Sequence, residues 1–315
     1  MQNPKKKSSL YLIILLFTFS AVSCQSKAEK EFVWFVVQPE AELGKSIDFS
    51  IHFEEKPDSI YTDVTAIKGL ELTDHLDKVR VNSESSIEDD HGKVIKSFYK
   101  FYTYAKPTKL GRIDFPIITA VYKGKEYKSK PFHINVVEKI SVSKNDIKAI
   151  WSTDKSTYKK KDTIKLSLYE YSKFPGARRS HSEVKNISLK GKDNQINLSV
   201  EETIDNIAGI DDFEKSVSQK FDIIDFDWNM SNERQSMEKI DNQFYVKTLI
   251  AELHLTSKTK ENSVIGPSDF DYHIYKNNED YLSGFVPTGK GTYHVTDNGS
   301  TKFNIKSNKI TIKVE

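Results

Sequence analysis

Residues 101–137 read FYTYAKPTKLGRIDFPIITAVYKGKEYKSKPFHINVV, a succession of short apolar runs separated by turn residues. In the first run, Phe101 and Thr103 alternate with two tyrosines, which is the period of two expected of a strand with one buried face. The last run, Phe132–Val136, alternates in the same way with polar neighbours. The segment therefore predicts the closing strands of a β-sandwich, and its side chains are not arranged for catalysis.

Proline and glycine divide this segment into its strands. Pro107 and Gly111 bracket a turn, and Lys123–Lys125 forms a tight hairpin connection because its central glycine tolerates the positive φ of such turns. The run between them, Ile113–Tyr122, predicts a single strand that contains Pro116. Because proline has no N–H to donate to a ladder, we expect this strand to lie at a sheet edge or to carry a bulge there.

The residues upstream complete a first sandwich. Phe32–Gln38 is an apolar run, and Ile47–Phe53 alternates apolar with polar residues, as a strand with one solvated face does. Further strands are expected at residues 64–72, 79–81 and 94–104, with a hairpin tip at residues 89–93. About seven strands in about 105 residues is the density of an immunoglobulin-like sandwich, so residues 32–138 are predicted to form one.

A linker at residues 139–145 leads to a second module of the same design. Ile164, Leu166 and Leu168 repeat the stripe of the first module. Other apolar runs lie at residues 147–151, 221–228, 244–255, 263–275 and 303–314. Their order matches that of the first module, so the chain is predicted to be all-β, with tandem immunoglobulin-like β-sandwiches at residues 32–138 and 145–315.

The pattern of the second module is interrupted at residues 173–220. We interpret this part as an insertion in the second sandwich. Within it, apolar residues from Ile204 to Phe213 recur at three-residue steps, which indicates one short amphipathic helix.

The N-terminus has the layout of an export signal. Lys5–Lys7 form a positive region, Leu10–Phe19 is an apolar core about half as long as the ~20 residues of a spanning helix, and small residues lead to Cys24. This pattern predicts a signal peptide at residues 1–23 and a lipidated tether at residues 24–31. Since Cys24 is the only cysteine, no disulfide can form within one chain. We expect a lipoprotein of the bacterial cell envelope, facing the periplasm and held at the membrane by acyl chains on Cys24.

The charge of the mature chain argues against nucleic acid as a partner. The full sequence has 47 Lys+Arg and 45 Asp+Glu, and loss of Lys5–Lys7 with the signal peptide leaves 44 basic residues. A near-neutral surface with both signs interspersed offers no electrostatic case for binding a polyanion.

Two patterns resemble catalytic or phosphate-binding motifs, and each has a plainer interpretation. Gly284–Lys290 matches most of a phosphate-binding loop, yet Gly291 takes the place of the magnesium-binding hydroxyl and no strand-to-helix setting surrounds it, so a plain loop is expected. Asp225 and Asp227 lie two residues apart, near the spacing of a retaining glycosidase pair, but they also fit the solvent side of a strand.

The eight histidines lack the close pairing that zinc ligands on one strand or helix usually show. They are His52, His75, His91, His133, His181, His254, His273 and His294. We therefore expect no catalytic residue, no cofactor and no metal. The 15 tyrosines and 18 phenylalanines fall mainly on predicted core stripes, and an aromatic sugar-binding face stays open as an alternative.

Three motifs follow one another in the first module. They are Tyr104 with Pro107, then Gly111–Pro116, then Gly124–Pro131. Their order resembles the BatD, or oxygen-tolerance, family of bacteria, in which Tyr-x-x-x-Pro, Gly-x-hydrophobic-x-hydrophobic-Pro and Gly-x-x-Tyr-x-Ser-x-Pro occur in sequence. The first motif is one residue shorter here. The resemblance covers residues 38–138 and becomes diffuse beyond them.

The resemblance implies a tandem immunoglobulin-like scaffold without catalytic residues. Such proteins are encoded beside MoxR-type ATPases and von Willebrand A-domain membrane proteins and are implicated in aerotolerance or envelope stress. Members commonly carry a membrane-spanning helix toward the C-terminus, whereas residues 307–315 read as a strand, so a lipid on Cys24 is expected to replace that anchor. Two functions follow: a non-enzymatic, lipid-anchored scaffold that binds envelope proteins, or a glycan-binding lipoprotein of a polysaccharide-uptake system.

Overall fold

The computed structural model of this chain describes residues 31–88, 91–174, 178–179, 187–188, 217–228, 234–289 and 292–315. Residues 31–315 form one compact unit. The predicted signal peptide at residues 1–23, the lipidation site Cys24 and the helix expected from Ile204 to Phe213 lie outside the described residues. Within the described ranges, no helix has the length and apolar character needed to cross a bilayer.

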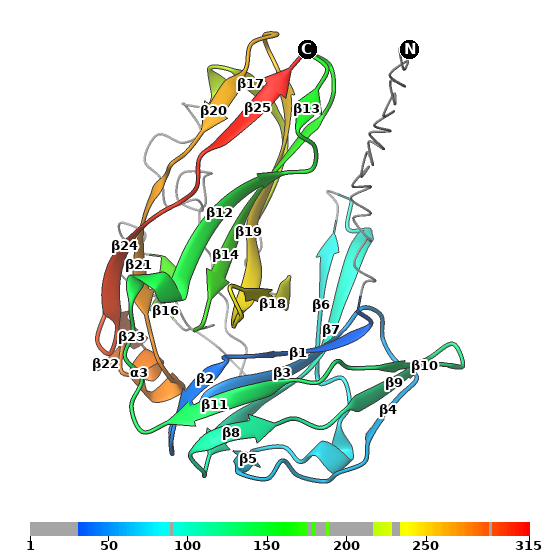
Figure 1. The fold of residues 1–315 in the computed structure, drawn as a ribbon, viewed down its shortest axis with the longest axis vertical. Helices are drawn as coiled ribbons and strands as arrows, with labels where there is room; N and C mark the ends of the chain where they lie inside the picture. The colour runs from blue at the N-terminus through cyan, green and yellow to red at the C-terminus, as the bar shows by residue number, and fades with distance from the viewer. Residues whose placement is uncertain are drawn as a thin grey trace, which may run out of the picture. The chain divides into compact units, whose positions relative to one another are not determined.

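The first sandwich contains a five-stranded sheet in the order β1-β3-β7-β5, with β6 paired to the first part of β7 (Figure 1). These strands are β1 (Val33–Val37), β3 (Ile47–Phe53), β5 (Leu70–Leu72), β6 (Ser83–Glu88) and β7 (Val94–Pro107). Two three-stranded sheets, ordered β10-β9-β4 and β2-β11-β8, pack against it. Their strands are β2 (Glu40–Glu42), β4 (Ser59–Thr62), β8 (Gly111–Asp114), β9 (Ile118–Tyr122), β10 (Lys125–Lys128) and β11 (His133–Val137), and a 3-10 turn, η1, covers Leu76–Lys78.

The alternating stripe of β3 forms one wall of the first core. Its inward residue Phe49 is fully buried, and the Phe115 ring from the facing layer lies 5.5 Å from it, centroid to centroid. Phe35 of β1 meets the same Phe115 ring edge-on at 5.1 Å. Because burying a phenylalanine stabilises a fold by about 1.5–3 kcal/mol, this aromatic group holds the two layers together.

The second sandwich is built from the same kind of sheets. Its five-stranded sheet has the order β12-β14-β19-β17, with β18 paired to β19. These strands are β12 (Ile147–Thr153), β14 (Ile164–Ser172), β17 (Phe221–Trp228), β18 (Gln235–Ile240) and β19 (Gln243–Ser257). Three-stranded sheets follow the orders β13-β25-β20, β15-β21-β24 and β16-β23-β22. Their strands are β13 (Thr157–Tyr158), β15 (Arg178–Arg179), β16 (Ile187–Ser188), β20 (Ser263–Ile265), β21 (Asp269–Ile274), β22 (Phe285–Gly289), β23 (Thr292–Val295), β24 (Thr301–Lys306) and β25 (Ile310–Val314). A short helix, α3 (Asn278–Leu282), and a 3-10 turn, η2 (Lys144–Asp146), complete the elements.

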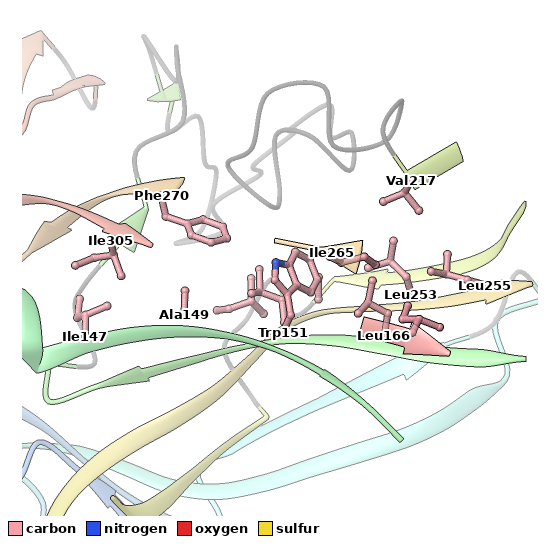
Figure 2. Close-up of a cluster of buried hydrophobic side chains, with 14 of the residues drawn as sticks. Ile147, Ala149, Trp151, Leu166, Val217, Leu253, Leu255, Ile265, Phe270 and Ile305 are labelled. Carbon is pink, nitrogen blue, oxygen red and sulfur yellow. The ribbon is translucent and has the colours of Figure 1, made fainter. Parts of the chain in front are cut away.

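The two sandwiches repeat one topology, which confirms the predicted tandem all-β architecture. β12, β14 and β19 take the places of β1, β3 and β7. β25 pairs in parallel with β13 and antiparallel with β20, as β11 does with β2 and β8. Each sandwich has its own hydrophobic core. In the second, the Trp151 ring lies among Leu166, Ile265 and Phe270, and its Nε1 donates to Ser268 Oγ at 3.1 Å (Figure 2).

The prediction of a single strand at Ile113–Tyr122 is wrong. β8 ends at Asp114 and β9 begins at Ile118, and the two strands pair in different sheets. Pro116 interrupts the ladder because it has no N–H, and the interruption lets the chain cross from one sheet to the other. The predicted run at residues 263–275 is divided in the same manner, at Gly266-Pro267, into β20 and β21.

Two other predicted strands of the first module need correction. Residues 64–72 contain strand structure only at β5, and residues 79–81 contain none. Val79 is buried beside η1, and Val64 is 40% exposed. Both valines lie in turn or loop segments and are not paired in a β-ladder. The two predicted hairpins are confirmed. In the first, Glu88 lies opposite Val94. In the second, Lys123 and Gly124 have φ values of 50° and 73°, as a two-residue hairpin turn requires.

Candidate protein-interaction surfaces

The two aspartates considered as a glycosidase pair each contact a different basic side chain. Asp227 accepts two hydrogen bonds from the Arg234 guanidinium, at 2.6 and 2.9 Å. Asp225 lies 3.4 Å from Nδ1 of His254. Both aspartates are on β17, which pairs with β19 through a register shift between Ile223 and Asp225. The bidentate bond from Arg234, the residue directly before β18, therefore gives Asp227 of β17 a structural role.

The segment that resembles a phosphate-binding loop is a strand. Residues Phe285–Gly289 form β22, so the prediction of a plain loop is wrong for these residues. β22 pairs with β23 and follows α3, which is the reverse of the strand-to-helix order that a phosphate-binding loop requires. Lys290 and Gly291 lie outside the described residues.

The histidines stand in separate environments. Across the described part of the chain, no group of three His, Cys, Asp or Glu side chains is placed to hold a metal ion. His273 is buried on β21 with Nδ1 3.1 Å from both Ser300 Oγ and Asp297 Oδ1, and His52 is buried on β3. His181 lies outside the described residues.

His52 is a buried, neutral histidine of the first sandwich. Its Nε2 lies 3.0 Å from Ser50 Oγ, and the Ser50 hydroxyl donates to Val36 O at 3.1 Å. Because serine has one hydroxyl proton, the bond to His52 forms best with Nε2 as the donor. Burial, reinforced by the positive charge of Lys100, lowers the pKa of His52 to about 3. The His52 ring lies 5.7 Å from that of Trp34, a residue that joins the two sandwiches.

A buried carboxylate joins the two sandwiches. Glu42, at the end of β2, is 5% exposed. It accepts hydrogen bonds from Ile140 N at 2.8 Å and from Asn277 Nδ2 at 3.1 Å, and Lys276 Nζ lies 3.4 Å from it. An unpaired buried charge is costly, so the Glu42 carboxylate must keep these three partners. The partners therefore hold β2 against the linker and the second sandwich.

The helix α3 carries the rest of this polar contact. Asn277 caps the helix by accepting from Asp280 N at 2.8 Å. On the first sandwich, Ser46 N donates to the Glu279 carboxylate at 3.1 Å, and Ser46 O accepts from Asn278 N at 2.9 Å. The start of α3 is thus bound to the turn before β3 through both backbone and side chains.

A second contact between the sandwiches is made by the β18–β19 hairpin. Trp34 Nε1 of β1 donates to Gln235 O at 3.0 Å. Phe244, at the start of β19, packs edge-on against the Phe132 and His133 rings, with centroids 5.5 and 6.0 Å apart. Met237 of β18 also packs against the first core. The hairpin of the second sandwich is therefore seated on the first.

The equivalent hairpin of the first sandwich, β6–β7, exposes apolar side chains. Val94 and Ile95 are 50% and 67% exposed. A second exposed group lies on α3 and β22, where Leu282 is 62% and Val286 39% exposed. Exposed apolar side chains of this kind mark candidate contact surfaces for a protein partner.

The residues that connect the two sandwiches, Glu42, Ser46, Trp34 and Phe244 with their partners, are called the joint below. Sequence patterns did not predict them. Glu42 and Ser46 lie between the predicted strands at residues 32–38 and 47–53, and Trp34 and Phe244 lie within predicted strands, without a role. One local signal was available: Asn277 followed three residues later by Asp280 is the pattern of a helix N-terminus. The partners of these residues lie 98 to 235 positions away in the chain, so no local pattern could reveal them.

Comparisons with known proteins add little to this description. No protein-family model matches the chain, and no curated protein sequence matches it. Among solved structures, the C-terminal domain of the Streptococcus pyogenes antigen I/II-family protein AspA has a TM-score of 0.20 and 8% identity, covering 90% of this chain and all of that one. The Streptococcus agalactiae antigen I/II polypeptide BspA C-terminal domain has a TM-score of 0.18 and 7% identity, covering 89% of this chain and 99% of that one.

Proposed function

We propose that this chain is a non-enzymatic, lipid-anchored scaffold of the bacterial cell envelope that binds protein partners through its sandwiches. The observation that carries the proposal is the buried joint at Glu42. The Glu42 carboxylate accepts hydrogen bonds from the linker and from the second sandwich, which holds the two modules in one relative orientation. A scaffold that presents surfaces to partners needs such a fixed orientation. The exposed Ile95 and Leu282 supply apolar surface for such contacts.

The proposed anchor is a lipid on Cys24, with the chain facing the periplasm. Metabolic labelling with an alkyne analogue of palmitate tests it. The wild-type chain should be labelled and should sediment with membranes, and Cys24→Ser should lose the label and be released. An unlabelled wild-type chain would remove the anchor from the proposal.

The proposed partners are envelope proteins, including von Willebrand A-domain membrane proteins of a MoxR-linked system. This part of the proposal is supported by the motif resemblance at Tyr104, Gly111–Pro116 and Gly124–Pro131. Affinity purification of the intact lipoprotein after chemical cross-linking in cells should yield a von Willebrand A-domain protein in defined cross-links. The Cys24→Ser chain serves as the control for proximity to the membrane. Cross-links to a TonB-dependent receptor and glycosidases instead would favour the second function.

That second function, glycan binding, is favoured by one aromatic surface on β7. Tyr104 is 47% exposed, and its ring lies edge-on to that of Tyr102 at 5.5 Å. The Tyr102 hydroxyl donates to Asp48 Oδ1 at 2.9 Å, and burial together with the Asp48 charge raises the pKa of Tyr102. Aromatic rings beside a polar network can bind a sugar face. Calorimetry with a panel of envelope and host polysaccharides, using Tyr104→Ala as the control, distinguishes this function from protein binding.

A further inference from the structure

The five-stranded sheet of the first sandwich is buried on both of its faces around β3. Phe49 and Ile51 of this strand belong to the hydrophobic core. Because side chains alternate along a strand, Ser50 and His52 point to the opposite, outer face. Both are nevertheless buried, as is Val36 of β1, which pairs with Ser50 and belongs to neither hydrophobic core. The outer face of the sheet is therefore covered at this place.

The cover comes from the second sandwich. Trp34 lies opposite His52 in the β1–β3 ladder, and the two rings are 5.7 Å apart. Nε1 of Trp34 donates to Gln235 O of β18, and β18 lies against β1. His52 therefore lies in the layer between the two sandwiches, and their separation would expose its ring to water.

The charges around His52 disfavour a second positive charge there. Lys100 of β7 lies directly opposite His52 in the ladder. On β18, Lys239 shares a strand face with Met237, which packs against the first sandwich. On the outer face of β3, the Asp48 carboxylate accepts two hydrogen bonds of its own, and β1 has no charged residue. An imidazolium at this place would thus face lysines and little water.

Opening of the joint is linked to proton uptake by this histidine. Burial, and after it the charge of Lys100, lowers the pKa of His52 to about 3 in the closed joint, against 6.5 for the unperturbed group. Above pH 6.5 the ring is neutral whether the joint is closed or open. Between pH 6.5 and 3 the exposed ring binds a proton that the buried ring does not, so acid favours the open joint by about tenfold per pH unit.

We propose that mild acid opens the joint between the two sandwiches, and that protonation of His52 drives the opening. Each sandwich keeps its own core, and the contacts that break are those between the modules, such as Trp34 with Gln235. The two modules then lose their fixed relative orientation. This inference goes beyond the proposed function, and it depends neither on the lipid anchor nor on the identity of a partner.

Two tryptophan side chains allow a direct test. The indole N–H of Trp34 reports on the joint because its acceptor, Gln235 O, belongs to the other sandwich. The indole N–H of Trp151 donates to Ser268 Oγ inside the second core and is the matched reference. NMR measures hydrogen exchange of both groups in the full chain at pH 7.5, 6.5 and 5.0, and each protection factor is the intrinsic rate at that pH divided by the measured rate. We expect the protection factor of Trp34 to fall about thirtyfold from pH 7.5 to 5.0, and that of Trp151 to stay constant.

Two variants assign the effect to one histidine. His52→Gln keeps an N–H donor and cannot titrate, so its Trp34 protection factor should change less than about twofold over this range. His133→Gln removes the histidine that contacts the β18–β19 hairpin, and it should behave as the wild type does. The ring nitrogen shifts of His52 in the wild-type chain give a measurement that needs no variant: in the closed joint the ring should still be neutral at pH 5.0.

Several results would overturn the proposal. One is a Trp34 protection factor that stays constant with pH, and another is an equal fall at Trp151, which would mean that the second core unfolds. A third is an unchanged fall in folded His52→Gln, or a fall that disappears in His133→Gln. A His52 ring that is charged at pH 5.0 while Trp34 stays protected would show that the closed joint accepts the proton.

Discussion

At the scale of single residues, two buried titratable groups show how the fold accommodates them: His52 is held neutral and Glu42 is paired. His52 is 4% exposed and bonded to Ser50, and Glu42 is 5% exposed with three donors. Such groups cost stability when buried without partners, so each one makes the fold sensitive to a defined change of protonation or of side chain.

The buried His52 makes stability depend on pH. Its pKa is about 3 in the folded chain, against 6.5 for the unperturbed group. Above pH 6.5 the histidine is neutral in both states. Between pH 6.5 and 3 the unfolded chain binds a proton that the folded chain does not, so the free energy of unfolding should fall with decreasing pH, by up to ~1.4 kcal/mol per pH unit.

Urea unfolding at pH 7.5, 5.5 and 4.5 measures this dependence. His52→Gln keeps an N–H donor and cannot titrate, so its stability should fall less steeply than that of the wild type over this range. Equal slopes for the two proteins would show that His52 does not remain neutral in the folded chain.

Gly299 is required by both its backbone conformation and its neighbours. Its φ is +77°, and an added Cβ would overlap the carbonyl oxygen of Asp280 in α3. Gly124 has a similar φ of +73° with nothing within 4 Å of an added Cβ. We expect Gly124→Ala to cost ~1–2 kcal/mol from the left-handed conformation alone, and Gly299→Ala to cost clearly more. Chemical denaturation of the two variants side by side measures the difference, and equal costs would contradict the predicted overlap.

At the scale of elements, hydrophobic alternation predicted strands well where one sheet continues and failed where the chain changes sheets. β3 and β14 coincide with their predicted stripes. The runs around Pro116 and Pro267 were predicted as continuous strands because their apolar character continues through the break. The proline removes the N–H, and the sheet change that follows depends on partners elsewhere in the chain.

Asn277 tests how α3 is held to the first sandwich. Asn277→Asp keeps the cap on Asp280 N, yet it removes the donor to Glu42 and places a second carboxylate beside it. We expect a loss of ~3 kcal/mol at pH 7, larger than that of Asn277→Ser, which also keeps a capping oxygen but adds no charge. The difference in the free energy of unfolding between the two variants should become smaller in acid, where two adjacent carboxyl groups can share a proton. Urea denaturation of both variants at pH 7 and pH 4.5 measures this difference. A difference that is unchanged in acid would show that charge repulsion is not its cause.

At the scale of the whole molecule, the sequence predicted two sandwiches but not the contact between them. The repeat of topology follows from local patterns that recur, and these are visible in one sequence. The joint depends on pairs such as Trp34 with Gln235 and Glu42 with Asn277, which lie more than 200 positions apart in the chain and leave no local pattern.

The seat of the β18–β19 hairpin should couple the two sandwiches energetically. Phe244→Ala removes the ring that contacts Phe132 and His133, and a loss of ~1–3 kcal/mol at the joint should open it without unfolding either core. Hydrogen exchange of amides in β1 and β18 should then accelerate at least about tenfold, whereas amides of β14 in the second core should keep their protection. Ile224→Ala, at a position 57% exposed on β17, is the control and should leave exchange at β1 and β18 unchanged. If Phe244→Ala also leaves these amides protected, the remaining contacts between the sandwiches, among them those of Glu42, Ser46 and Trp34, suffice without the Phe244 ring.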